Sequence, residues 1–158
     1  MYRVPVDEEG LIVPGAGYLA EPFLGTVLEF HRRSGLGLPL TVVHSGGRLR
    51  LQAPVRFRNG WWRGLPHLLE VRADPVGTGL DVGWMLAVED QGFLRSLLGG
   101  PGPGRELAER ADAGAQATRA RLTLTRSFHD LVLLPAVDVL VAEVEGRPMR
   151  RRWKQSGR

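Results

Sequence analysis

The sequence contains no cysteine. Disulfide bonds, thiolate-bound metal ions and cysteine nucleophiles are therefore excluded. There is also no run of about 18 uninterrupted apolar residues, as a membrane-spanning helix needs. The first residues have neither the basic nor the apolar segment of a secretory signal. These absences predict a soluble, cytoplasmic protein that is not exported and is not an integral membrane protein.

Lysine is almost absent, because Lys154 is the only lysine among the 21 basic residues. The formal net charge is +4 and the sequence pI is about 10.5. An arginine excess beside 21 glycines and 11 prolines can follow from genome composition as well as from selection for phosphate binding. The positions of the arginines, rather than their number, must separate these two explanations.

The remaining composition is that of a folded protein. With 158 residues, of which 43% are hydrophobic and 24% charged, the chain can bury a core and is predicted to form one domain. We expect that domain to cover residues 1–146. Residues 147–158, RPMRRRWKQSGR, are predicted to be a basic and mobile tail.

The longest alternating stretch covers residues 48–58 and predicts a half-buried antiparallel strand. One face of this strand carries the apolar residues Leu49, Leu51, Ala53, Val55 and Phe57, and the other carries Arg48, Arg50, Gln52, Arg56 and Arg58. Pro54 cannot donate a ladder hydrogen bond, so it indicates an edge strand or a bulge.

Similar alternation predicts strands at residues 40–44, 67–73 and 80–89, which together with residues 48–58 form a meander. A short strand or a hairpin is expected at residues 2–13, around an acidic turn at residues 7–10. Apolar residues at helical spacing predict an amphipathic helix from Glu21 to Ser34 that covers one face of the sheet.

The second half of the chain is predicted to add two short helices between about residues 90 and 118. Residues 119–125 alternate again and residues 131–144 are apolar on both faces, so both are predicted to be strands. The predicted fold class is therefore α+β: an antiparallel meander packed by one long amphipathic helix, with two shorter helices inserted before the last strands.

The leading functional hypothesis is a non-enzymatic protein that binds nucleic acid or another anionic polymer. Residues two apart on a strand lie about 6.6 to 7 Å from each other, so the arginines at 48, 50, 56 and 58 could follow several phosphates. Arg72 and Arg121 are expected to continue this row on neighbouring strands, and Trp61 and Trp62 could stack on bases. The alternative is a solvated face in a protein whose abundant basic residue is arginine.

The C-terminal segment offers a second anion-binding candidate. Its residues Arg150, Arg151, Arg152, Trp153 and Lys154 combine charge with an aromatic ring. Such a segment can hold an anionic polymer or an acidic membrane surface, with an affinity that falls as salt rises. It can equally be a solubilising terminus.

No catalytic residue, metal site or cofactor is predicted. The histidines at 31, 44, 67 and 129 lack a second ligand at metal-binding spacing. No serine lies in a G-x-S-x-G motif. The glycine clusters lack the further residues of dinucleotide-binding or phosphate-binding loops, so each is better explained as a turn.

A small apolar ligand held between helix and sheet is the alternative function. Phe23, Phe30, Phe57, Trp84 and Phe93 could line such a cavity, or could simply fill the core. Lipid-binding folds that grip a helix in a curved sheet normally end in a long helix, whereas this sequence predicts strands and a tail there. A third possibility is a homo-oligomer, in which a second copy covers an exposed apolar edge.

Overall fold

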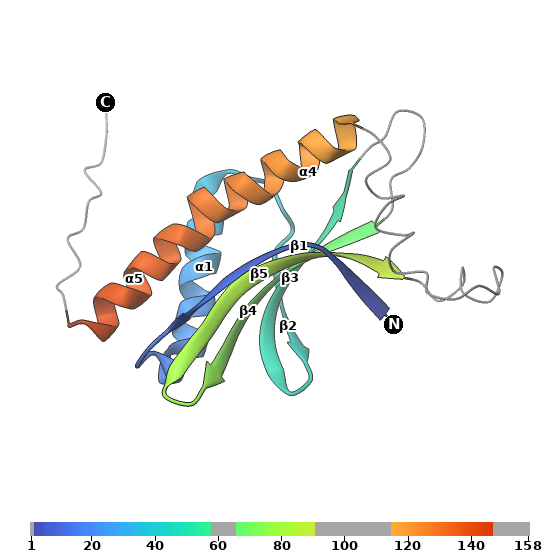
Figure 1. Ribbon diagram of the computed structural model, residues 1–158. Helices are drawn as coiled ribbons and strands as arrows, with labels where there is room; N and C mark the ends of the chain where they lie inside the picture. The colour runs from blue at the N-terminus through green and yellow to red at the C-terminus, as the bar shows by residue number, and fades with distance from the viewer. Residues whose placement is uncertain (1, 58–65, 91–114, 147–158) are drawn as a thin grey trace, which may run out of the picture.

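The computed structural model describes residues 2–57, 66–90 and 115–146, which form an antiparallel five-stranded sheet with helices on one of its faces (Figure 1). The elements in chain order are β1 (Tyr2–Val13), the 3-10 helix η1 (Gly17–Leu19), α1 (Ala20–Ser34), β2 (Thr41–Ser45), β3 (Arg48–Arg56), β4 (Pro66–Val76), β5 (Gly79–Asp90), α4 (Ala115–Phe128), the π-helical segment η2 (His129–Leu133) and α5 (Leu134–Val144). The predicted α+β class is confirmed.

The sheet has the strand order β1-β5-β4-β3-β2. Strands β2 to β5 are neighbours in both sequence and space, so the predicted meander is confirmed. The turn between β2 and β3 uses Gly46 and Gly47, whose φ angles are 59° and 75°. Backbone in this left-handed region favours glycine because it has no Cβ. The first strand of the chain, β1, pairs with the last one, β5.

Pro54 lies where β3 has lost one of its neighbours. The last pair between β2 and β3 joins Thr41 to Gln52, and β3 continues beyond it while pairing only with β4. The backbone at Pro54 therefore has no β2 residue opposite it on that side. The proline occupies a local edge of a strand that is internal elsewhere, as its missing N–H requires.

Helix α1 agrees with its prediction. Phe23, Leu24 and Val27 are buried, and the helix packs on β3 and β4. It ends at Gly35, whose φ of 70° is the left-handed conformation that commonly terminates helices. This helix covers the apolar face of the meander.

The strands predicted at residues 119–125 and 131–144 are wrong, because the described part of the chain ends in one long helical run, α4-η2-α5. Buried residues recur along it at helical spacing: Ala117, Phe128, Val132, Ala136 and Leu140. Seven alternating residues span only two helical turns, and a short apolar run fits a buried helix as well as a strand. The buried apolar residues of η2 and α5 pack on α1 and belong to the same core as the apolar residues of the sheet.

Of the two alternatives for the N-terminal segment, the hairpin with its acidic turn is wrong, and the segment is a single strand. Residues 7–10 do not turn; they continue β1 and pair with residues 83–86 of β5. A register shift between Pro5 and Asp7 marks a β-bulge, which accommodates the proline and one extra residue in a single strand. Most of the region in which the two shorter helices were predicted lies outside the described residues.

The hydrophobic core lies between the sheet and the helices. It includes the predicted aromatic residues Phe23, Phe57 and Trp84, with Phe30 partly buried at its margin, whereas Phe93 lies outside the described residues. The space between α1 and α5, beside Phe23 and Leu140, amounts to only about 10 Å³. The two helices therefore pack closely against each other.

Strands β1 and β5 approach each other closely at Gly10 and Gly83. A Cβ atom added to Gly83 would lie 2.4 Å from the carbonyl oxygen of Glu9 and 2.8 Å from the Cα of Gly10. Both neighbours are backbone atoms, so neither can move aside without displacing the strand. Glycine is required at position 83 by space rather than by its backbone angles.

Replacing Gly83 with alanine is expected to lower the free energy of unfolding by about 1–3 kcal/mol, because the new methyl group forces β1 away from β5. Urea unfolding followed by circular dichroism measures this change. The control is Gly25→Ala in α1, where an added Cβ meets nothing within 4 Å. That substitution should stabilise the protein by roughly 0.5–1 kcal/mol. Equal effects of the two alanines would contradict the close approach of the strands.

Candidate functional site

The structure separates the residues that were predicted to form one anion-binding face. Arg48, Arg50 and Arg56 on β3 and Arg72 on β4 lie on the sheet face opposite the helices. Arg121 was expected on a neighbouring strand, but it lies on helix α4, on the other side of the sheet. The remaining predicted residues are outside the described part of the chain: Arg58, Trp61, Trp62, Arg150, Arg151, Arg152, Trp153 and Lys154.

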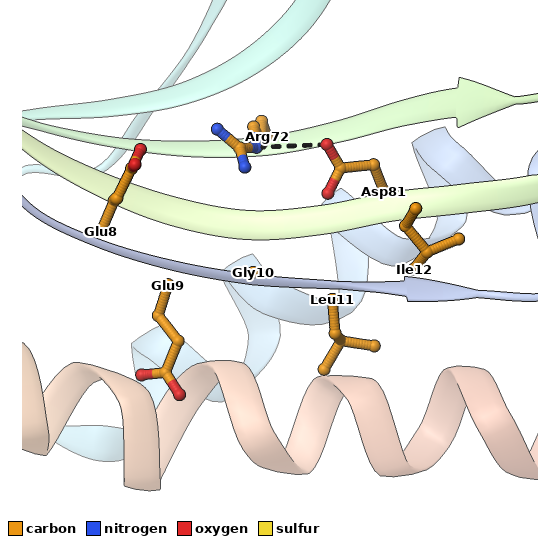
Figure 2. Close-up of a pocket in the computed structure, with 7 residues that line it drawn as sticks. All are labelled: Glu8, Glu9, Gly10, Leu11, Ile12, Arg72 and Asp81. Atoms are coloured by element: carbon orange, nitrogen blue, oxygen red, sulfur yellow. Dashed lines mark ion pairs between the residues drawn. The ribbon is translucent and has the colours of Figure 1, made fainter.

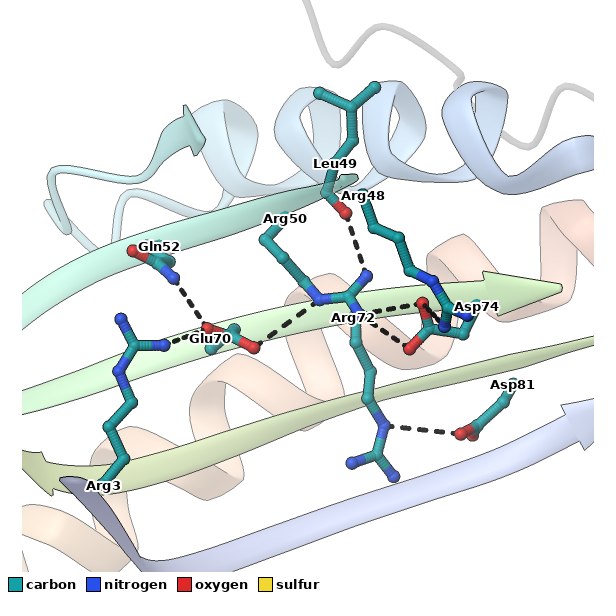
Figure 3. Close-up of polar contacts among 9 residues, drawn as sticks. All are labelled: Arg3, Arg48, Leu49, Arg50, Gln52, Glu70, Arg72, Asp74 and Asp81. Carbon is teal, nitrogen blue, oxygen red and sulfur yellow. Dashed lines mark hydrogen bonds and ion pairs between the residues drawn. The ribbon is translucent and has the colours of Figure 1, made fainter. Parts of the chain in front are cut away.

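On the open face, Arg48, Arg50 and Arg72 form ion pairs with acids of the neighbouring strand (Figure 3). The guanidinium of Arg50 lies 2.8 Å from Asp74 and 3.6 Å from Glu70. Arg48 lies 2.8 Å from the same Asp74 carboxylate. Two cations therefore share one acid, and one of these cations also reaches a second acid.

The network continues toward β1. Arg3 donates to Glu70 at 2.7 Å, and the amide of Gln52 donates to the same carboxylate at 2.7 Å. Arg72 lies 3.5 Å from Asp81 on β5. Positive and negative side chains thus alternate across the strands, and the face is not a continuous positive row. Arg56 forms no ion pair with any described residue.

The centre of this network is largely shielded from water. The side chains of Arg50, Asp74 and Glu70 are only 12%, 13% and 14% exposed. Burial alone would raise the pKa of Asp74, but hydrogen bonds and charges from Arg48 and Arg50 outweigh it and hold that pKa below its usual value. These residues bind each other and hold strands β3 and β4 together.

Replacing Asp74 with asparagine is expected to lower the free energy of unfolding at pH 7 by about 1–3 kcal/mol, because Arg50 loses a buried partner. A carboxyl group with a lowered pKa in the folded state stabilises the fold above its unfolded pKa of about 3.9. The difference between wild type and variant should therefore shrink as pH falls below about 4.

Urea unfolding at several pH values measures this dependence. Arg48→Gln serves as the control, because Arg48 is 57% exposed and an exposed ion pair contributes only about 0–1 kcal/mol. A difference between wild type and Asp74→Asn that is independent of pH would rule out the proposed role of the Asp74 charge.

A second group of polar side chains lies on the opposite, helix-covered side of the sheet. The Oε2 atom of Glu9 on β1 lies 3.1 Å from Nδ1 of His129 on η2. This distance allows an ion pair, although the contact lacks the geometry of a hydrogen bond. Figure 2 shows the Glu9 carboxylate pointing toward this helix. The contact links the edge of the sheet to the middle of the helical run.

Trp84 is the register partner of Glu9 on β5 and lies on the same side of the sheet. Its side chain belongs to the core, and the residue is only 3% exposed. The indole Nε1–H is buried and makes no hydrogen bond to any described residue. Buried polar groups of native proteins nearly always have a partner, so this N–H requires an explanation.

Polar residues of the helical run face the interior at intervals of four: Arg121, Thr125 and His129. Thr125 is 3% exposed, and its hydroxyl donates to the Leu122 carbonyl at 3.3 Å. The Nε and Nη1 atoms of Arg121 are buried. We call these three residues, together with Trp84 and with Glu9, whose side chain is 57% exposed at the margin, the interior polar cluster.

The π-helical segment His129–Leu133 separates this polar stripe from an apolar one. Val132 within it and Ala136, Val137 and Leu140 beyond it are buried, and they pack toward α1. An extra residue in a helical turn rotates the faces that follow it, and such segments occur frequently at functional sites. The helix therefore changes from a polar to an apolar interior face at the point where Glu9 meets it.

The other histidines do not join the interior polar cluster. The ring of His67 is buried edge-on against Phe57, with a centroid distance of 4.9 Å. Burial lowers the pKa of His31. His31 is therefore less able to carry the positive charge that stabilises the C-terminal end of a helix. Within residues 2–57, 66–90 and 115–146, no three His, Asp or Glu side chains are arranged to hold a metal ion.

A third feature is a groove of about 470 Å³ beside residues 8–12 of β1 (Figure 2). It is lined by Glu8, Glu9, Gly10, Leu11, Ile12, Arg72 and Asp81. We call it the β1 edge groove. The sequence pattern missed it because the acidic run was interpreted as a turn. The interior polar cluster was missed because residues 119–125 were interpreted as a strand.

No protein-family model, curated protein or solved structure matches this chain. Among the helices of the described residues, none has both the length and the apolar character needed to cross a membrane. Arguments about function therefore rest on the geometry of this chain.

Proposed function

We propose that this protein binds a small, largely apolar molecule between the sheet and the α4-η2 segment, through a hydrogen-bond acceptor on that molecule. The observation that carries the proposal is the buried Trp84 Nε1–H, which has no partner among the described residues. An unsatisfied buried donor costs about 1–3 kcal/mol. A ligand that accepts this hydrogen bond would recover that energy.

The surroundings of Trp84 have the composition of a ligand site. Such sites are mainly apolar, with a few polar groups that fix the orientation of the ligand. Here the apolar part comes from core residues such as Val71 and Phe128, and the polar part is the interior polar cluster. Because Trp84 presents an N–H donor, the favoured acceptor on the ligand is a carbonyl or carboxylate group.

The buried residues of the helical run differ along its length, and this difference supports a site toward α4. On the part of the run that packs on α1, the buried residues Val132, Ala136 and Leu140 are apolar. Toward α4 the helix presents Arg121 and Thr125 instead. The order of elements supports the same arrangement. Lipid-binding folds that hold a helix against a curved sheet normally have a long helix after the strands, and α4-η2-α5 is such a helix, although the sequence did not predict it.

Nucleic-acid binding through the open face stays a prediction. The ion pairs of Arg48 and Arg50 with Asp74 and Glu70 do not favour it, because a polyanion would have to compete with these carboxylates. A cytoplasmic carrier of a small molecule uses the helix-covered side and leaves the ion-pair network intact. For this reason we give the interior site precedence.

The test measures binding of two probes, 1-anilinonaphthalene-8-sulfonate and decanoate, to the full chain. We expect the fluorescent probe to bind with a stoichiometry of about one per chain and to be displaced by decanoate. Trp84→Phe keeps an aromatic six-membered ring but removes the five-membered ring that carries the N–H. It should weaken decanoate binding by about 3- to 10-fold, the equivalent of one hydrogen bond, and circular dichroism checks that the variant is folded.

Met85→Leu provides the matched control, because Met85 is adjacent to Trp84 and points to the opposite sheet face. It should bind decanoate as the wild type does. Failure of the wild-type chain to bind either probe, or equal decanoate affinity of Trp84→Phe and wild type, would contradict the proposed site.

A further inference from the structure

Strand β1 forms one edge of the sheet, and its outer side pairs with no described strand. Exposed edges invite pairing with another chain segment, and proteins commonly protect them with proline, bulges or charge. The first half of β1 has Pro5 and a bulge. The second half has neither, and its apolar side chains Leu11 and Ile12 are 42% and 59% exposed. This half is suited to receive an additional strand.

The exposed residues of β1 differ in a regular way along the strand. Glu8 and Ile12 point to the open face, whereas Glu9 and Leu11 point to the helix side (Figure 2). Gly10 lies between them without a side chain. A strand added antiparallel to this edge would therefore meet apolar residues on both faces first and acids on both faces afterwards. A segment that complements β1 in this way has, from its N-terminal end, two apolar residues, one residue of any kind and two basic residues.

The C-terminal segment of this chain contains that pattern as Pro148, Met149, Arg150, Arg151 and Arg152. We propose that residues 147–158 bind the β1 edge groove within the same chain by antiparallel strand addition. In this register Pro148 lies opposite Ile12 and Met149 opposite Leu11. Arg151 and Arg152 then lie opposite Glu9 and Glu8, where opposite charges on paired strands stabilise the pair.

The point at which the chain leaves α5 fits this register. A Cβ atom added to Gly15 would lie 3.3 Å from Cγ1 of Val144, so the end of α5 lies beside the end of β1. Gly146, with a φ of 61°, allows the chain to change direction there. Residue 147 would then lie opposite Val13, and each following residue matches one residue of β1 in the reverse direction. The short connection also gives a high effective concentration.

Charge complementarity also supports the basic C-terminal segment as the occupant of this groove. The chain has a net charge of +4, yet the β1 edge groove contains Glu8, Glu9 and Asp81 against a single arginine, Arg72. Glu9 borders both this groove and the interior polar cluster, but the ligand proposal is tested at Trp84 and this one at the C-terminal arginines, so either can fail without the other.

The absence of cysteine permits a cross-linking test on the full chain. With Glu8→Cys and Arg152→Cys, we expect an intrachain disulfide to form readily, because opposite residues of antiparallel strands lie within disulfide range. Adding Arg150→Glu and Arg151→Glu keeps the tether length unchanged, and the disulfide should then form at least about 10-fold more slowly. Arg150→Lys with Arg151→Lys should preserve the rate. Mass spectrometry of the oxidised monomer measures these rates.

Equal rates of disulfide formation in the double-cysteine chain and in its glutamate and lysine variants would show that the two cysteines meet without docking of the segment. That result would overturn the proposal. A predominantly interchain disulfide would assign the segment to a second copy and would also overturn it. Hydrogen exchange on the otherwise unmodified chain gives a second measurement. Amides of residues 8–12 should exchange at least about 5-fold faster after Arg150→Glu, Arg151→Glu and Arg152→Glu, and unchanged exchange would count against docking.

Discussion

The close approach of β1 to β5 at Gly10 and Gly83 determines the positions of the other features. It joins the first strand of the chain to the last strand of the meander, and it leaves a strip without side chains across two strands. Arg72 extends over this strip on the open face, where its Nη2 lies near Gly10. On the other face the same stretch of β1 carries Glu9 to His129. A wider spacing would displace both contacts and the edge groove between them.

The two faces of the sheet have different physical roles. The open face is held by a compact network in which Asp74 and Glu70 each bind two arginines. The helix-covered face is apolar beside α1 and becomes polar toward α4. Charge on the open face is satisfied by nearby residues, whereas Trp84 on the covered face has a donor without a described acceptor. This difference favours the covered face as the place where a ligand binds.

The sequence predicted the meander, α1 and the α+β class because each has a long, regular apolar pattern. Residues 48–56 alternate over a full strand, and Phe23, Leu24 and Val27 mark one helix face. Residues 119–144 gave the wrong result because their pattern fits two periods. The four-residue spacing of Arg121, Thr125 and His129 was the signal that could have revealed the helix and its polar face.

The candidate site could not be predicted to the same extent, because it depends on pairing between distant residues. Glu9 and His129 are 120 positions apart in sequence (129 minus 9), and no local pattern relates them. The arginine row was identified correctly as one strand face, but the partners that neutralise it come from β4. Composition shows how many charges exist, and only the register of the strands shows which of them meet.

The pairing of β1 with β5 also bears on how the chain acquires its structure. Its contacts join residues separated by 67 positions (13 to 80) up to 88 positions (2 to 90), whereas β2 to β5 pair with their immediate neighbours. Loop closure over such distances is slow, and it delays contacts that local hairpins make early. During synthesis, residues 2–13 emerge first and find their partner only after the meander has left the ribosome. The acidic edge and the bulged proline keep this waiting strand from pairing with other chains.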